Sequence, residues 1–165
     1  MKQLLAGYGI SQVALIVGDI EEAVRKYKGT FGYGPWIGYN YDSQIVKSLT
    51  YRGKPSKTKW KFVMTEVGNL NFELIQPISK GDNIFSEFVE NHGYGLHHLG
   101  YNVDNVQKVI EIAKGYGIEI LQEGKGFGQD GDGHFAFLDT LESLGVVIEL
   151  REPPKRRIFP HFRYE

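Results

Sequence analysis

The amino-acid sequence predicts an α+β fold that is built from two tandem βαβββ modules. The first observation is a repeat: residues 12–17 (QVALIV) return as residues 98–103 (HLGYNV), and each is followed by a charged run with helical spacing. The second is that residues 72–77 (FELIQP) are echoed by residues 148–153 (IELREP), so the two copies keep their order. A duplicated unit normally folds twice and packs against its own copy.

The first copy begins with residues 11–17, which are rich in Val, Ile and Leu and predict a strand. Asp19 is the expected N-cap of a helix, because acidic residues follow it in the first turn and apolar residues then recur at helical spacing. Glycines at positions 29–34 and Pro35 end this helix. The strands expected to complete the module are residues 44–51, 60–65 and 70–75.

The second copy repeats this pattern after a bridge that contains a short helix at residues 83–89. Residues 96–103 predict a strand, and Asp104 is the expected N-cap of the helix that follows. The strands expected to complete this module are residues 118–122, 134–139 and 146–151. The predicted organisation is a single structural domain with a first module (1–78), a connecting segment (79–95), a second module (96–153) and a basic, aromatic tail (154–165).

Two segments have no counterpart in the other copy. Residues 124–133 (GKGFGQDGDG) are dense in glycine but lack the Gly-Lys-Ser/Thr ending of a P-loop. Asp130 and Asp132 resemble the start of a calcium loop whose closing glutamate is absent. The plain interpretation is a flexible connector, and the alternative is an active-site lid. The tail is either a disordered end or a strap over a neighbouring subunit.

Composition excludes several classes of function. The net charge of −1 gives no electrostatic argument for binding nucleic acid or an acidic membrane. The sequence has no apolar run of the roughly 20 residues that a membrane span needs, and its start has no signal-peptide core. The absence of cysteine excludes disulfides, thiolate metal sites and a cysteine nucleophile. A cytoplasmic protein with 41% hydrophobic and 24% charged residues is expected.

Four polar positions recur in register in the two copies: Gln12, Glu73, His98 and Glu149. Glu73 and Glu149 each lie between apolar neighbours in a predicted strand, so each points to the opposite face from those neighbours. One such glutamate is most often on the solvent face, and a lone histidine is more often structural than a ligand. The recurrence of all four positions favours a shared polar centre, where a metal ion would offset the cost of buried carboxylates.

At this point the chain resembles the vicinal oxygen chelate superfamily (glyoxalase, bleomycin resistance and dioxygenase proteins). The resemblance spans about residues 10–153 and rests on three segments: 68–77 (GNLNFELIQP), 95–100 (GLHHLG) and 145–150 (GVVIEL). These segments are most similar to methylmalonyl-CoA epimerases. The resemblance implies that the paired βαβββ modules form a cup-like, partly open mixed β-barrel around a metal.

The resemblance assigns metal ligation to Gln12, Glu73, His98 and Glu149, and His97 is expected to face away. Epimerases usually have His at the first position, whereas a Gln, Glu, His, Glu set is similar to one branch of glyoxalase I. An iron dioxygenase is disfavoured because its facial triad needs two histidines. The expected cofactor is one divalent metal ion, and Zn, Co, Ni, Mn and Mg all suit such ligands.

The implied reaction is abstraction of a proton next to a carbonyl, with a metal-stabilised enediolate, Glu149 as the leading base and Glu73 at the opposite face. The first substrate class is an acyl-CoA like methylmalonyl-CoA. The alternatives are a thiol adduct, as in lactoylglutathione lyase, and a non-catalytic, resistance-type binding protein. The resemblance also implies a homodimer.

Overall fold

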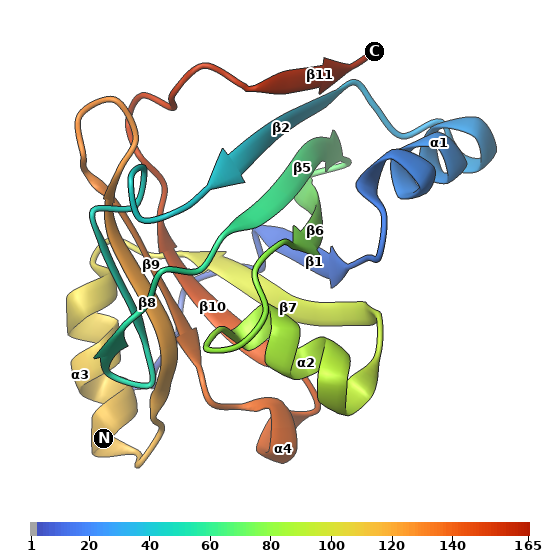
Figure 1. Ribbon diagram of the computed structural model, residues 1–165. Coiled ribbons are helices and arrows are strands. Elements are labelled where there is room, and N and C mark those ends of the chain that lie inside the picture. The colour runs from blue at the N-terminus through green and yellow to red at the C-terminus, as the bar shows by residue number, and fades with distance from the viewer. Residues whose placement is uncertain (1–2) are drawn as a thin grey trace.

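The computed structural model describes residues 3–165, and in it each copy of the repeat forms a βαβββ module (Figure 1). The first module consists of β1 (Gln12–Ile16), α1 (Ile20–Phe31), β2 (Trp36–Tyr41), β5 (Trp60–Val67) and β6 (Leu70–Pro77). The second consists of β7 (Gly95–Asn102), α3 (Val106–Gly115), β8 (Ile120–Phe127), β9 (Gly133–Leu138) and β10 (Val147–Glu152).

The remaining elements are additions to this plan. They are β3 (Ser48–Tyr51), β4 (Lys54–Pro55), α2 (Ile84–His92), α4 (Leu141–Leu144) and β11 (Phe162–Tyr164). The short strands β3 and β4 come from the first module and pair with each other; β3 also pairs with β8 of the second module, and β11 pairs with β2. The added strands therefore extend the two outer edges of the sheet.

All strands belong to one mixed sheet with the order β11-β2-β5-β6-β1-β7-β10-β9-β8-β3-β4. The two modules meet where β1 pairs antiparallel with β7, and the order on either side of this pair is symmetrical. The sheet curls around a cavity without closing, with helices α1 and α3 on its outer side (Figure 1). The predicted fold, two modules in a partly open mixed barrel, is confirmed.

The two long helices begin in equivalent ways. The Asp19 side chain caps α1 by accepting a hydrogen bond from the Glu22 backbone N–H, as predicted. The cap of α3 is Asn105 and not Asp104, so that prediction was wrong by one residue. A side chain at the end of each parallel strand also accepts from the first helical N–H: Gln76 Oε1 from Ile20 and Glu152 Oε2 from Val106.

The strand predicted at residues 44–51 is only partly present. Residues 42–47 form a turn in which the Asp42 carboxylate accepts from the backbone N–H of Gln44, and the strand begins at Ser48. Strand β2 was not predicted, because Gly34-Pro35 was interpreted only as the end of the helix and the next strand was placed at residues 44–51. Gly38 in this strand has a packing role: a Cβ there would lie 1.8 Å from the Phe162 ring, so only glycine lets β11 pack across β2.

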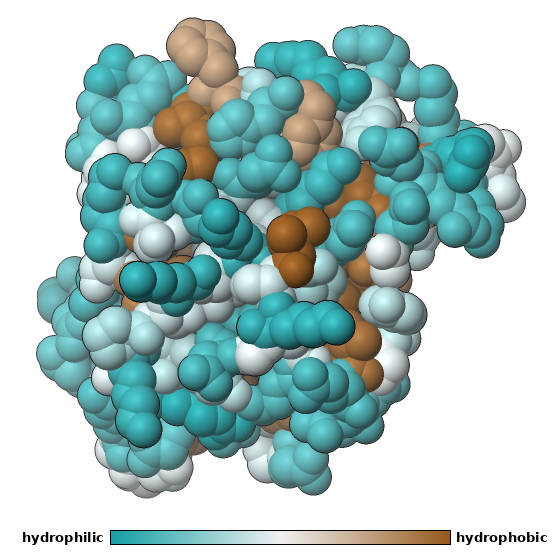
Figure 2. Space-filling view, viewed as in Figure 1, coloured by the Kyte–Doolittle hydropathy of each residue, from teal (hydrophilic) through white to brown (hydrophobic). Residues whose placement is uncertain are grey.

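The inner face of the sheet carries the largest hydrophobic cluster, and α1 and α3 cover two further clusters on its outer side. The face seen in Figure 2 is mainly hydrophilic, as the composition predicts. No helix in residues 3–165 has the length and apolar character needed to cross a bilayer.

Candidate functional site

The four polar positions that recur in the sequence meet at the middle of the sheet. Gln12, Glu73, His98 and Glu149 come from the neighbouring strands β1, β6, β7 and β10, and none is more than 8% exposed. His98 Nε2 lies 3.3 Å from Glu149 Oε2, 3.3 Å from Gln12 Oε1 and 3.6 Å from Glu73 Oε2. Residues far apart in sequence are thus brought into one buried polar centre.

The strand register explains why they meet. Glu73 lies level with Ala14 on β1, and Glu149 lies level with Gly100 on β7. Ala14 in turn pairs with His98, and Gly100 pairs with Gln12. The strand that carries Glu73 therefore runs parallel to the strand that carries Gln12, and the strand that carries Glu149 runs parallel to the strand that carries His98. The pseudo-twofold axis relates these positions residue by residue.

The Gln12 amide is oriented by a neighbour on β6. Gln12 Nε2 donates to Asn71 Oδ1 at 2.8 Å, and Asn71 Nδ2 donates to Glu66 Oε1 at 3.2 Å. Because the amide nitrogen is used in this way, Gln12 Oε1 faces His98. The side chain thus presents an oxygen to the centre, as a metal ligand would.

His97 does not contact the other members of the centre but lies directly behind His98. A bulge in the pairing of β1 with β7 leaves His97 without a partner on β1, and its Nδ1 lies 2.9 Å from His98 Nδ1. Both rings are buried, and burial lowers the pKa of His97 well below its usual value and that of His98 to about 3. When both imidazoles are neutral, the Nδ1–H of one ring can donate a hydrogen bond to the unprotonated Nδ1 of the other, and this bond fixes the orientation of the His98 ring.

Burial also dominates the two carboxyl groups. It raises the pKa of Glu73, with the nearby Glu149 charge adding to the effect, and it raises the pKa of Glu149. Arg151 opposes both increases, and Arg157 opposes that of Glu73. The protein therefore holds two desolvated carboxyl groups whose proton affinity is above normal.

The donor set fits a divalent metal ion in its chemistry. Glu149 Oε2 is buried and has no hydrogen-bond donor, and it faces the same point as oxygens of Gln12 and Glu73. Converging acceptors without a donor are costly unless a cation lies between them. Within residues 3–165, however, no three His, Cys, Asp or Glu side chains are already arranged as a group that could hold a metal. Binding would therefore require side-chain shifts.

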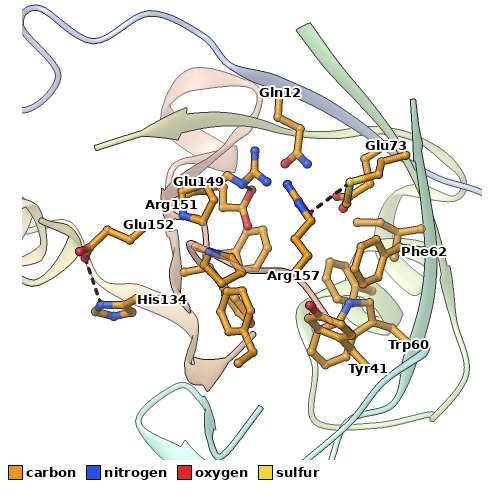
Figure 3. A pocket seen from close by; sticks show the side chains of 18 residues that line it. Gln12, Tyr41, Trp60, Phe62, Glu73, His134, Glu149, Arg151, Glu152 and Arg157 are labelled. Atoms are coloured by element: carbon orange, nitrogen blue, oxygen red, sulfur yellow. Dashed lines mark hydrogen bonds and ion pairs between the residues drawn. The ribbon is translucent and has the colours of Figure 1, made fainter. Parts of the chain in front are cut away.

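The polar centre lies at the inner end of an open cavity (Figure 3). The cavity contains roughly 560 Å³ of free space, counting its mouth. Its walls include seven aromatic residues: Tyr41, Trp60, Phe62, Phe85, Phe127, Phe135 and Phe137. Burial raises the pKa of Tyr41 to about 12, so its hydroxyl stays protonated as a hydrogen-bond donor. A small organic molecule with an apolar part would fit such a cavity.

Two arginines of the cavity were not predicted from the sequence. Arg151 lies two residues after Glu149 on β10, so strand alternation could have placed it on the same face. Its Nε lies 3.5 Å from Glu149 Oε2. Arg157 comes from the tail and enters at the cavity mouth, where no sequence pattern indicated it (Figure 3).

The two unmatched segments contact each other. The Gln129 backbone N–H donates to Arg156 O at 2.9 Å, Gln129 Nε2 donates to Arg157 O at 2.7 Å, and Arg156 forms an ion pair with Asp130. The glycine-rich segment thus includes the end of β8 and a turn that binds the tail, rather than a free connector. The tail continues to β11, which pairs with β2 of its own chain, so the interpretation as a disordered end was wrong. The strap over a neighbouring subunit stays a prediction.

Comparison with known proteins gives consistent matches. Residues 11–137 match the family model described as Glyoxalase/Bleomycin resistance protein/Dioxygenase superfamily. The chain is 25% identical over 143 residues to human mitochondrial methylmalonyl-CoA epimerase, covering 87% of this chain and 73% of the relative. It is 25% identical over 144 residues to an ethylmalonyl-CoA/methylmalonyl-CoA epimerase of Cereibacter sphaeroides, covering 87% and 96%.

Solved structures share the fold. Streptomyces coelicolor methylmalonyl-CoA epimerase in complex with 2-nitronate-propionyl-CoA matches with a TM-score of 0.65 and 15% identity, covering 90% of this chain and 96% of that one. The Mycobacterium tuberculosis methylmalonyl-CoA epimerase matches with a TM-score of 0.62 and 16% identity, covering 93% and 92%. At these identities the matches establish the architecture alone.

Proposed function

Because the chain belongs to the glyoxalase/bleomycin resistance/dioxygenase superfamily, we propose that it is an isomerase or epimerase that removes a proton from a carbon next to a carbonyl group. The observation that carries this proposal is the pair of buried carboxyl groups, Glu73 and Glu149, on two sides of one centre. Their similarity to each other suits a reaction that can proceed from either face of a carbon.

The proposed bases are Glu149, as the leading candidate, and Glu73 at the opposite face. A carboxylate in water is too weak a base to take a proton from carbon at a useful rate, and burial strengthens it by raising its pKa. An epimerase needs a group that takes the proton on one face and a group that returns it on the other. The pseudo-twofold arrangement supplies one carboxyl group for each task.

Gln12, Glu73, His98 and Glu149 are the proposed ligands of a divalent metal ion, of which Zn, Co, Ni, Mn and Mg suit the donor set. When bound, such an ion would stabilise the negative charge that develops on a substrate oxygen as the proton is removed. The chain itself orients these ligands: Asn71 holds the Gln12 amide, and His97 holds the His98 ring.

The proposed substrate class is an acyl-CoA like methylmalonyl-CoA, which the two epimerases that resemble this chain by sequence support. Lactoylglutathione lyase activity is the second candidate, and Gln12 favours it because the Gln, Glu, His, Glu set is similar to one branch of glyoxalase I. Gln12 itself lies in the centre with its oxygen toward His98, as a ligand in either reaction would.

The test is a deuterium-exchange assay at C2 of methylmalonyl-CoA, beside an assay of hemithioacetal isomerisation, on protein whose metal content has been measured. We expect exchange at C2 that is lost on chelation and restored by a divalent metal. Isomerisation without exchange would support the lyase. A protein that binds no metal and catalyses neither reaction would support a non-catalytic binding role. The proposed homodimer is tested separately by light scattering.

A further inference from the structure

We infer that Arg151 and Arg157 form an anion-binding site in the cavity, which holds a carboxylate group of the substrate. The inference rests on the proposed function for the meaning of "substrate", but its geometry is independent of that function. Arg151 lies on β10 beside Glu149, and Arg157 reaches the cavity from the tail. Figure 3 shows the Arg157 side chain extending toward Gln12 between Glu73 and Glu149.

The backbone around Arg157 is held on both sides. Before it, the turn at residues 128–132 binds the tail through Gln129 and the Arg156–Asp130 pair, in which Arg156 Nε donates to Asp130 Oδ2 at 2.8 Å. After it, β11 pairs with β2 at Phe162 and Gly38. The two segments that break the internal repeat therefore act together to place one guanidinium group at the cavity mouth.

The Arg157 guanidinium lacks a charged partner. Across residues 3–165 its one side-chain hydrogen bond is from Nη1 to Met64 Sδ at 3.4 Å, and a thioether sulfur is a weak acceptor. No carboxylate lies within ion-pair distance of it in that part of the chain, although a guanidinium has five N–H donors in a planar fork that suits carboxylates. Arg157 is exposed as a residue and lines the cavity, so an incoming anion can reach it.

Arg151 extends the site inward. The Arg151 side chain is 12% exposed, and its Nε lies 3.5 Å from Glu149 Oε2, which is longer than a typical charged hydrogen bond. At the rim, His134 Nδ1 lies 3.6 Å from Glu152 Oε2. The cavity lining contains three carboxyl groups, Glu73, Glu149 and Glu152, and two guanidinium groups, Arg151 and Arg157. A bound divalent metal would leave the cavity positive, so an anionic substrate would be favoured over a neutral one.

The test uses metal-free protein and malonate, a dicarboxylate that has no thioester and needs no turnover, with binding followed by calorimetry. We expect Arg157→Gln to weaken malonate binding by about tenfold or more, and Arg157→Lys to weaken it less. The matched control is Arg163→Gln, which removes the same charge from an exposed position of the tail outside the cavity and should change binding less than about twofold.

Three results would overturn the inference: no malonate binding by the unaltered protein, equal loss in Arg163→Gln, and equal binding of uncharged malonamide. Arg157-dependent binding of inorganic phosphate without malonate would also overturn it, in favour of a phosphate site.

In the exchange assay we expect Arg157→Gln to raise KM with kcat retained. Arg157-dependent malonate binding in a protein without exchange activity would refute only the proposed function, whereas unchanged binding and KM would refute only this inference.

Discussion

Gln12 Nε2 donates a hydrogen bond to Asn71 Oδ1 at 2.8 Å, and this contact determines which end of the Gln12 amide faces the buried centre. The oxygen consequently points to His98, with the carboxyl groups of Glu73 and Glu149 around the same ring nitrogen. Among the four positions of the centre, Gln12 and His98 are the pair at which the two halves of the repeat differ. The orientation of Gln12 is therefore controlled by a residue outside the centre.

We predict that Asn71→Leu weakens metal binding by about tenfold, because the Gln12 amide loses the partner that orients it. Competition with a chromophoric chelator measures this affinity. Asn69→Ala, at the turn between β5 and β6, is the control and should bind metal as the unaltered protein does. Unchanged affinity in a folded Asn71→Leu protein would refute the role of this hydrogen bond.

A second prediction concerns Gly100, which lies opposite Gln12. A Cβ at Gly100 would lie 2.9 Å from Gln12 Cβ, 3.1 Å from Gln12 Oε1 and 3.0 Å from Arg151 Cδ. Gly100→Ala therefore has to displace both side chains, and we expect kcat/KM to fall by at least about tenfold, because small misplacements of catalytic groups are costly. The expected loss of unfolding free energy is about 1–3 kcal/mol.

The control for Gly100→Ala is its symmetry-related position, Ala14, which pairs with His98. Ala14→Gly removes a buried methyl group and should cost about 1 kcal/mol of stability, but it leaves Gln12 in place. Chemical denaturation and steady-state kinetics on both variants separate the two effects. If activity falls in proportion to stability in both, Gly100 has no special role at the centre.

The sequence could predict the centre because duplication acts as an internal comparison: Glu73 and Glu149 are unremarkable singly, but they recur at one strand position. It could not predict the edges of the sheet. Gly38 has the appearance of a strand breaker until Phe162 is placed over it, and that pairing joins residues at opposite ends of the chain. Arg157 was missed for the same reason, since a contact between the tail and residues 128–132 leaves no local pattern.

A third prediction concerns the bases. Glu149→Gln should reduce C2 exchange at least about 100-fold, because the amide cannot accept a proton while its oxygen can still contact a metal. The fold should be intact, since the variant removes a buried carboxyl group whose Oε2 has no hydrogen-bond donor. Glu73→Gln should affect chiefly the opposite stereoisomer of the substrate. Retained exchange of both stereoisomers in Glu149→Gln would refute this assignment.

The last prediction concerns acid stability and His97. Burial lowers the pKa of His97, so below the unfolded-state pKa of about 6.5 the unfolded chain binds more protons than the folded one. This histidine's contribution to stability is therefore complete above that pH and is lost as the pH falls. Glu73 and Glu149 act in the opposite sense, because their raised pKa values favour the folded state at lower pH.

The effect of His97 is isolated by comparing metal-free unaltered protein with His97→Gln, in which the amide can still contact His98 Nδ1. Between pH 6.5 and 5.5 the unaltered protein should lose up to about 1.4 kcal/mol more unfolding free energy than the variant, the maximum for one proton over one pH unit. Urea denaturation at each pH measures the difference. Parallel pH profiles would mean that His97 binds protons equally in the folded and unfolded states. The buried His97–His98 contact would then not be the acid-sensitive element.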